Sequence, residues 1–84
     1  MDKADVQKRV IKVTSAVLGV PEEDITLKST FSGDLGAESI QSIQLVAAFE
    51  EEFGIEMDED EALSVTRVDK AVDFIAKVIE QQHG

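Results

Sequence analysis

The sequence predicts an all-α fold, a small four-helix bundle with three main helices and one short helix. Apolar residues recur at helical spacing in three separate segments, and a glycine follows each of the first two. No internal repeat, low-complexity stretch or strand-rich region interrupts these segments. A chain of 84 residues has room for one modest core and none for a deep catalytic cleft. We therefore expect a single domain over residues 1–84.

The first helix is predicted over about residues 5–18. Its apolar face consists of valines at helical spacing, Val6, Val10, Val13 and Val17. Gly19 follows as a C-terminal stop, and Pro21 resists continuation of the helix. About twenty residues then lack helical periodicity, and loops of this length are functional or contain a short helix. We expect Ile25, Leu27 and Phe31 to pin this loop over the core.

The second helix is predicted over Ser39–Phe53, and its apolar positions cover more than half of its circumference. One stripe at positions i, i+4 and i+8 is the expected core face, and it consists of Leu45, Phe49 and Phe53. Gly54 is expected to end this helix.

A second stripe of the same helix is expected to lie partly in solvent. Ile40, Ile43 and Ala47 run toward Glu50 and Glu51, and carboxylates are costly to bury unpaired. An apolar strip that continues into acids suits docking of a basic partner with a central apolar contact. A broad core contact with a solvated acidic end explains the pattern equally well. Proximity to the serine at the helix start favours docking.

Two further helices complete the predicted bundle. Asp58 with Glu61 has the form of a capping box for a short helix through Leu63. Thr66 with Asp69 suggests another cap, after which the last helix extends to about residue 81. The core face of this helix repeats at helical spacing and consists of Val68, Ala71, Val72, Ile75, Val78 and Ile79.

The charge balance favours proteins over nucleic acids and membranes as partners. The chain has 18 acidic and 8 basic residues and a net charge of −10. Such a field repels nucleic-acid phosphates and anionic lipid surfaces, and it steers basic protein patches toward the chain. The first residues contain no apolar run of signal-peptide or membrane-spanning length. We expect a cytoplasmic monomer without membrane insertion.

Few residues support chemistry by the chain itself. The only histidine, His83, lies in a tail that we expect to fray, so a serine nucleophile would lack a base. The acidic clusters at residues 50–52 and 58–61 are typical of solvated faces, and the second lacks the glycine of an EF-hand loop. Without cysteine, any thiol chemistry needs a thiol from a cofactor. We expect neither an enzyme nor a dedicated metal site.

Ser39 is the candidate attachment site. Gly33 and Gly36 allow a tight backbone path toward it, and the helix dipole favours anions near the start of the helix. A phosphate on this hydroxyl would therefore be well placed. From the local pattern alone, a plain N-cap role for Ser39 fits better, because serine is among the favoured caps.

Two motifs resemble those of the acyl carrier proteins, and the similarity extends over nearly all of the chain. The motifs are Asp34-Leu35-Gly36-Ala37-Glu38-Ser39-Ile40 and the helix end Glu-Glu-Glu-Phe-Gly-Ile at residues 50–55. The resemblance implies that Ser39 carries 4′-phosphopantetheine, transferred from coenzyme A by a phosphopantetheinyl transferase with its Mg²⁺. It also implies that the thiol of this arm carries acyl chains as thioesters. The chain would then be a phosphoprotein and a carrier without its own catalytic step.

The resemblance implies two further sets of site residues. The recognition helix would meet acyl-transfer and synthase enzymes with basic docking patches, through Glu38, Ile40, Ile43, Ala47, Glu50 and Glu51. An acyl pocket falls on positions that otherwise serve as plain core, Phe31, Phe49, Met57, Ala62, Leu63, Val65 and Ala71. The same positions can serve as core and as acyl pocket, because an acyl chain is buried in an apolar interior whose side chains can move apart.

Departures from the family pattern bear on the pathway. Glu38 and Ile40 keep the charge and the apolarity of the usual residues, whereas Gln41 and Gln44 stand where carriers of fatty acid synthesis often have acids. Phe49 replaces a more typical leucine and is expected to shorten the pocket. Fatty acid biosynthesis is the expected pathway, and a specialised carrier for a polyketide, lipid-modifying or other secondary pathway is the alternative. From a different class, the rival is an unmodified acidic helical adaptor, and an acyl-transfer enzyme ranks last.

Overall fold

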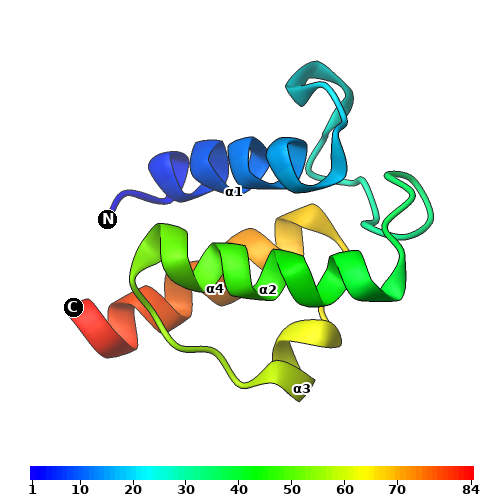
Figure 1. Ribbon diagram of the computed structural model, residues 1–84. Helices are drawn as coiled ribbons and strands as arrows, with labels where there is room; N and C mark the ends of the chain where they lie inside the picture. The colour runs from blue at the N-terminus through cyan, green and yellow to red at the C-terminus, as the bar shows by residue number, and fades with distance from the viewer.

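The computed structural model describes residues 1–84 and contains four α-helices and no strand (Figure 1). The helices are α1 (Lys3–Leu18), α2 (Ser39–Phe53), α3 (Glu59–Leu63) and α4 (Val68–His83), and a short 3-10 helix, η1, spans Glu22–Asp24. The predicted all-α bundle of three main helices and one short helix is confirmed. The 3-10 helix is the short element expected as one explanation of the long loop.

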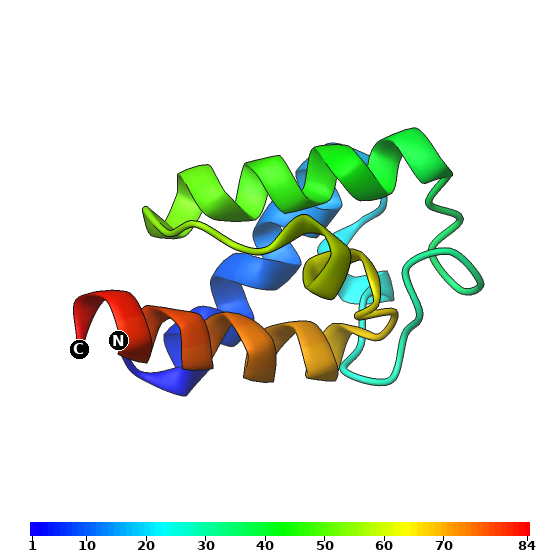
Figure 2. The ribbon, with the colours of Figure 1, turned by 90° about the horizontal axis from the view of Figure 1, so that it is seen from below.

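The helices form one bundle in which α1 packs against both α2 and α4. The short helix α3 packs against α2 on the side away from α1, as the views in Figures 1 and 2 both show. The two termini lie at the same end of the molecule in both views (Figures 1 and 2). The long connection between α1 and α2 crosses the opposite end, where α2 begins.

The core is built largely from the predicted stripes of the three long helices. In α1, Val6, Val10 and Val13 are buried and Val17 is half-buried. Leu45, Phe49 and Phe53 of α2 are buried, as are all six residues predicted for the core face of α4. Of the three apolar residues predicted to pin the long loop, Ile25 and Phe31 are buried. Leu27, in contrast, is 39% exposed. Its backbone carbonyl accepts a hydrogen bond from the N–H of Asp69 at 2.9 Å.

The start of α4 differs from the prediction. The N-cap is Arg67 rather than Thr66, whose carbonyl instead accepts a hydrogen bond from Phe31 N–H at 2.9 Å. The Asp69 carboxylate accepts from Arg67 Nε at 2.6 Å and from Lys70 N–H at 2.8 Å. The hydrogen bond with Arg67 lowers the pKa of Asp69 and raises the pKa of Arg67. Thr66 therefore serves the packing of the long loop, and the polar side chains of the first turn pair with each other.

The expectation of a frayed C-terminal tail is also wrong. Helix α4 continues to His83, because its last side chains bond the connection between α2 and α3. The Gln82 amide donates to the Glu56 carbonyl at 2.7 Å and accepts from Glu56 N–H at 3.0 Å. His83 Nε2 lies 2.7 Å from the carbonyl oxygen of Gly54. These contacts fasten the end of α4 to the end of α2.

None of the helices combines the length and the hydropathy that a bilayer-spanning segment needs. No group of three or more acidic or histidine side chains is gathered in a way that could hold a metal ion.

Candidate functional site

The long loop before α2 is tied to the connection between α3 and α4. Phe31 N–H donates to the Thr66 carbonyl at 2.9 Å, and Val68 N–H donates to the Ser29 carbonyl at 2.9 Å. These bonds draw residues 29–31 alongside residues 66–68. The loop therefore reaches the start of α2 from a fixed place on the bundle.

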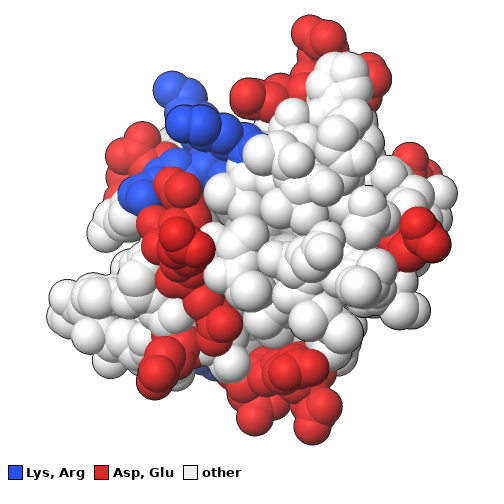
Figure 3. All heavy atoms as spheres, in the orientation of Figure 1, with Lys and Arg blue, Asp and Glu red and all other residues white.

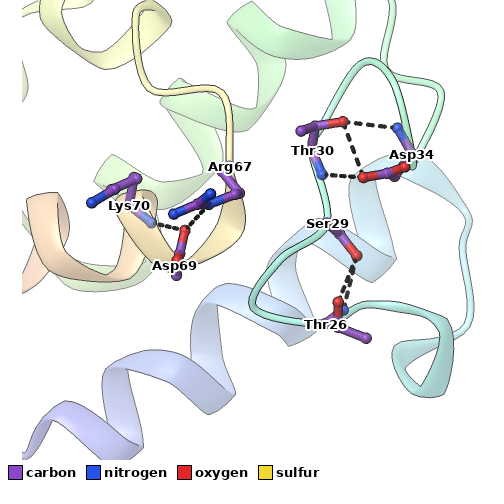
Figure 4. A network of polar contacts seen from close by, with 7 residues as sticks. All are labelled: Thr26, Ser29, Thr30, Asp34, Arg67, Asp69 and Lys70. Atoms are coloured by element: carbon purple, nitrogen blue, oxygen red, sulfur yellow. Dashed lines mark hydrogen bonds and ion pairs between the residues drawn. The ribbon is translucent and has the colours of Figure 1, made fainter.

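A tight turn then shapes the segment that leads into α2. Thr30 N–H donates to the Asp34 carboxylate at 2.8 Å, and Asp34 N–H donates back to Thr30 Oγ1 at 2.9 Å (Figure 4). Gly36 has a φ of 73°, a left-handed conformation that glycine adopts without strain. Ala37 is buried, and its N–H donates to the Phe31 carbonyl at 2.8 Å. The motif residues Asp34 and Gly36 thus serve to build the turn.

Ser39 is the first residue of α2 and not its N-cap. The N-cap is Glu38, whose N–H donates to the Gln41 side-chain oxygen at 2.9 Å. The plain N-cap interpretation of Ser39 is therefore wrong, because the Glu38 and Gln41 pair supplies the cap. Gln41, which the sequence singled out only as a lost acid, has a structural role. The Ser39 side chain is left exposed at the positive end of a 15-residue helix.

A largely apolar cavity of about 280 Å³ opens beside Ser39, between α2, α3 and α4. Ser39 itself is one of the residues that line it. All seven positions of the predicted acyl pocket also line this cavity, Phe31, Phe49, Met57, Ala62, Leu63, Val65 and Ala71. An engineered apolar cavity of about 150 Å³ holds one benzene molecule, with six carbon atoms. In the same proportion, the cavity beside Ser39 has room for about eleven carbon atoms.

Sequence reasoning missed several residues of the cavity. Five are apolar, Ala37, Leu45, Val46, Phe74 and Ile75, and three carry hydroxyls, Ser32, Ser42 and Thr66. Helical spacing from Ala71 to Phe74 and Ile75 was a signal for the apolar wall on α4. Ser42 lies one turn after Ser39 on α2, whereas Ser32 and Thr66 carried no such signal, because the path of the loops brings them to the cavity.

The wall of the cavity near Met57 is held by polar contacts. The Glu50 carboxylate accepts from Met57 N–H at 2.8 Å, and Glu50 is half-buried. Gln82 holds the preceding residue, Glu56, from the other side. Glu50, named from the sequence as a partner-facing acid, therefore has a partner within the chain.

The second stripe of α2 faces solvent, as expected. Ile40 is 65% exposed and Ile43 is 49% exposed, and Ala47 and Glu51 are exposed as well. Figure 3 shows a broad uncharged area on this side of the molecule, with acidic side chains gathered around its margins. Docking requires that this stripe be exposed, and it is. A broad core contact would instead bury Ile40 and Ile43, which are exposed.

No histidine lies within reach of Ser39. His83 contacts Gly54 at the other end of α2, about 20 Å away along a helix of this length. The site thus combines an exposed hydroxyl, the positive end of a helix and an adjoining apolar cavity, which suits covalent attachment of an anionic, partly apolar group.

Residues 8–75 of the chain match a family model described as the phosphopantetheine attachment site. The match covers the loop, the start of α2 and every residue that lines the cavity.

Proposed function

This chain belongs to the phosphopantetheine attachment site family, whose 4′-phosphopantetheine is bound covalently, and we propose that Ser39 is the residue that bears it. On this proposal, residues 1–84 form a single acyl carrier domain. Carrier domains of this family act with phosphopantetheinyl transferases and acyl-handling enzymes, and in general they are not catalysts.

The observation that carries the proposal is the place of Ser39 at the cavity. Its side chain is exposed at the first residue of α2, where the capping bonds are made by Glu38 and Gln41 and leave the hydroxyl free for modification. A phosphodiester there lies at the positive end of the helix. The same residue lines a cavity with an apolar interior.

Each part of the chain has a task in this function. The turn between Thr30 and Asp34 positions the segment before Ser39 so that the hydroxyl is presented to a transferase. When attached, the arm supplies a thiol that carries acyl groups as thioesters. Phe49, Leu63 and their neighbours exclude water from an acyl chain that enters the cavity, and each buried methylene contributes about 0.8 kcal/mol to its retention.

We expect the carrier to serve fatty acid biosynthesis in the cytoplasm as a monomer. What supports this pathway is the largely apolar lining of the cavity, which suits an alkyl chain. The second candidate is a specialised carrier for a polyketide, lipid-modifying or other secondary pathway. Gln44 favours it, because this exposed amide replaces an acid that carriers of fatty acid synthesis often have.

The test is the intact mass of the chain after incubation with coenzyme A, Mg²⁺ and a broad-specificity phosphopantetheinyl transferase. We expect a gain of one phosphopantetheine unit in the wild-type chain and in Ser42→Ala, and no gain in Ser39→Ala. Ser42 is the matched control because it lies one turn further along α2 and also lines the cavity. Modification that persists in Ser39→Ala would refute the assignment.

The adaptor alternative makes the opposite prediction. If the chain acts by binding alone, Ser39→Ala leaves its partner binding and its function intact. A complementation assay with Ser39→Ala in the organism's own pathway separates the two, because a carrier requires the arm and an adaptor does not.

A further inference from the structure

The aromatic side chains of this protein are concentrated at the cavity beside Ser39. The chain has four phenylalanines and no tyrosine or tryptophan. Three of the four line the cavity, and they reach it from the long loop (Phe31), from α2 (Phe49) and from α4 (Phe74). Phe31 and Phe49 are buried, and Phe74 is half-buried. Phenylalanines from three separate segments therefore bound the same space.

The fourth phenylalanine lies elsewhere in the core. Phe53 is buried but does not line the cavity, and the Arg9 guanidinium lies 5.0 Å from the centre of its ring. Met57, in contrast, lines the cavity together with the three phenylalanines. Thioether sulfur makes favourable contacts with aromatic rings. The cavity thus combines two kinds of side chain that favour an aromatic ligand.

A phenyl ring on the acyl group would gain contacts in this cavity that an alkyl chain lacks. Each well-oriented pair of rings contributes a factor of about two to twelve in an equilibrium constant beyond the area that it buries. A ring also has fewer rotatable bonds than an alkyl chain with the same number of carbons, so fixing it costs less entropy. The size fits, because benzene occupies a cavity of about 150 Å³ and this cavity of about 280 Å³ leaves room for a short linker.

Burial of apolar area alone predicts the opposite order. At equal carbon number, a straight alkyl chain has more hydrogen atoms and more apolar surface than a chain that ends in a phenyl ring. It therefore gains more from leaving water. A chain that ends in a cyclohexyl ring has the ring shape without the π-system. A comparison of these three acyl groups separates recognition of aromatic rings from burial of area and from shape.

We propose that the cavity favours an acyl group that ends in an aromatic ring, joined to the thioester by a short alkyl linker, over a straight alkyl chain with the same number of carbons. The proposal rests on the proposed function, since the acyl group is carried on the arm at Ser39. The reaction that supplies such a group is the transfer of an aryl-substituted acyl unit to the arm. This acyl group belongs to a specialised pathway, so the measurement also bears on the choice between the two candidate pathways.

The experiment compares 3-phenylpropanoyl, 3-cyclohexylpropanoyl and nonanoyl groups, which have equal numbers of carbons. A broad-specificity phosphopantetheinyl transferase loads each one from its coenzyme A thioester, and neutral hydroxylamine then cleaves the thioester. The readout is a protection factor, defined as the cleavage rate of the acyl group on free pantetheine divided by its rate on the chain. This ratio cancels the intrinsic reactivity of each thioester. We expect the 3-phenylpropanoyl group to be protected about fivefold more than nonanoyl and about threefold more than 3-cyclohexylpropanoyl.

Two matched variants test whether the cavity causes this preference. Phe49→Leu removes one ring from the lining and keeps an apolar side chain, whereas Phe53→Leu removes a buried ring outside the cavity. We expect Phe49→Leu to reduce the advantage of 3-phenylpropanoyl over nonanoyl to less than about twofold, and Phe53→Leu to leave it unchanged. Thermal unfolding shows whether each variant is folded at the assay temperature. If Phe49→Leu is not, Phe74→Leu takes its place, because Phe74 is only half-buried.

The proposal is overturned if nonanoyl is protected as well as 3-phenylpropanoyl, if the two ring-bearing groups are protected equally, or if the cavity variant behaves like Phe53→Leu. A chain that gains the arm but protects none of the three acyl groups also overturns it, and leaves attachment at Ser39 standing. A chain that never gains phosphopantetheine from coenzyme A would instead refute the proposed function, and this inference with it. Loading and protection thus distinguish the two failures.

Discussion

Replacing Gln82 by alanine should loosen the connection between α2 and α3. The Gln82 amide makes two hydrogen bonds with the backbone of Glu56, at 2.7 Å to its carbonyl and 3.0 Å from its N–H. The next residue, Met57, lines the cavity. Residues 82 and 83 lie beyond the part of the chain that matches the family model, so this fastening is not part of the matched pattern.

The size of the effect follows from the number and exposure of these bonds. A typical intramolecular hydrogen bond contributes about 0.5 to 1.5 kcal/mol net. Gln82 and Glu56 are both exposed, so water replaces the lost partner. The lower end of the range then applies to each hydrogen bond, which gives a loss of about 1 kcal/mol in the free energy of unfolding for the two bonds together. For a domain of this size, 1 kcal/mol lowers Tm by about 4 to 8 °C. Amide exchange at Glu56 should speed up about fivefold if opening is local.

Thermal unfolding and NMR-detected amide hydrogen exchange measure the two effects. The matched control is Gln81→Ala, which makes the same substitution in the same helical turn at an exposed residue that makes none of these bonds. The change in helix propensity cancels between the two variants. Equal exchange rates at Glu56 in Gln82→Ala and Gln81→Ala would show that the two Gln82 hydrogen bonds do not hold this connection.

Three other perturbations test the fold. Phe49→Ala should lower the free energy of unfolding by about 3 to 4 kcal/mol in chemical denaturation, because Phe49 is 5% exposed and lines the cavity; a loss below about 1 kcal/mol would contradict its core role. Asp69→Asn should destabilise the chain at neutral pH: the pKa of Asp69 is lowered by Arg67, so its contribution is present above about pH 4 and disappears as the pH falls through the lowered pKa. If the denaturation midpoints of the wild type and Asp69→Asn differed by the same amount at pH 7 and at pH 2.5, this linkage would be wrong. Finally, Tm should rise between about 10 mM and about 150 mM NaCl, since salt screens the repulsion from a net charge of −10, and an unchanged Tm would exclude that repulsion as a factor.

The helices were predictable because their core faces repeat at helical spacing. The six apolar positions of α4 and the Leu45, Phe49 and Phe53 stripe of α2 are all buried, so the pattern alone located them. The cap of α2 was not predictable in this way. Serine is a far commoner N-cap than glutamate, and only the bond from Glu38 N–H to Gln41 shows which residue has that role.

Contacts between distant segments are the part that local patterns do not encode. Gln82 and Glu56 lie 26 positions apart, and His83 and Gly54 lie 29 apart. The sequence offered only a polar tail, which favoured fraying. The cavity was predictable through family resemblance, because its lining comes from four separate segments that no single periodicity joins. The exposed state of Ile40 was predictable because its stripe runs toward Glu50 and Glu51, whose carboxylates are costly to bury unpaired.

On the proposed function, an acyl chain carried on the arm at Ser39 enters the cavity between α2, α3 and α4. The most direct measurement loads the chain with a ¹³C-labelled octanoyl arm and records nuclear Overhauser effects between the acyl chain and the protein. The account predicts effects from the acyl methylenes to side chains of the cavity such as Phe49, Met57 and Leu63. An acyl chain that shows no effects to these side chains and has the shifts of a solvated chain would contradict it.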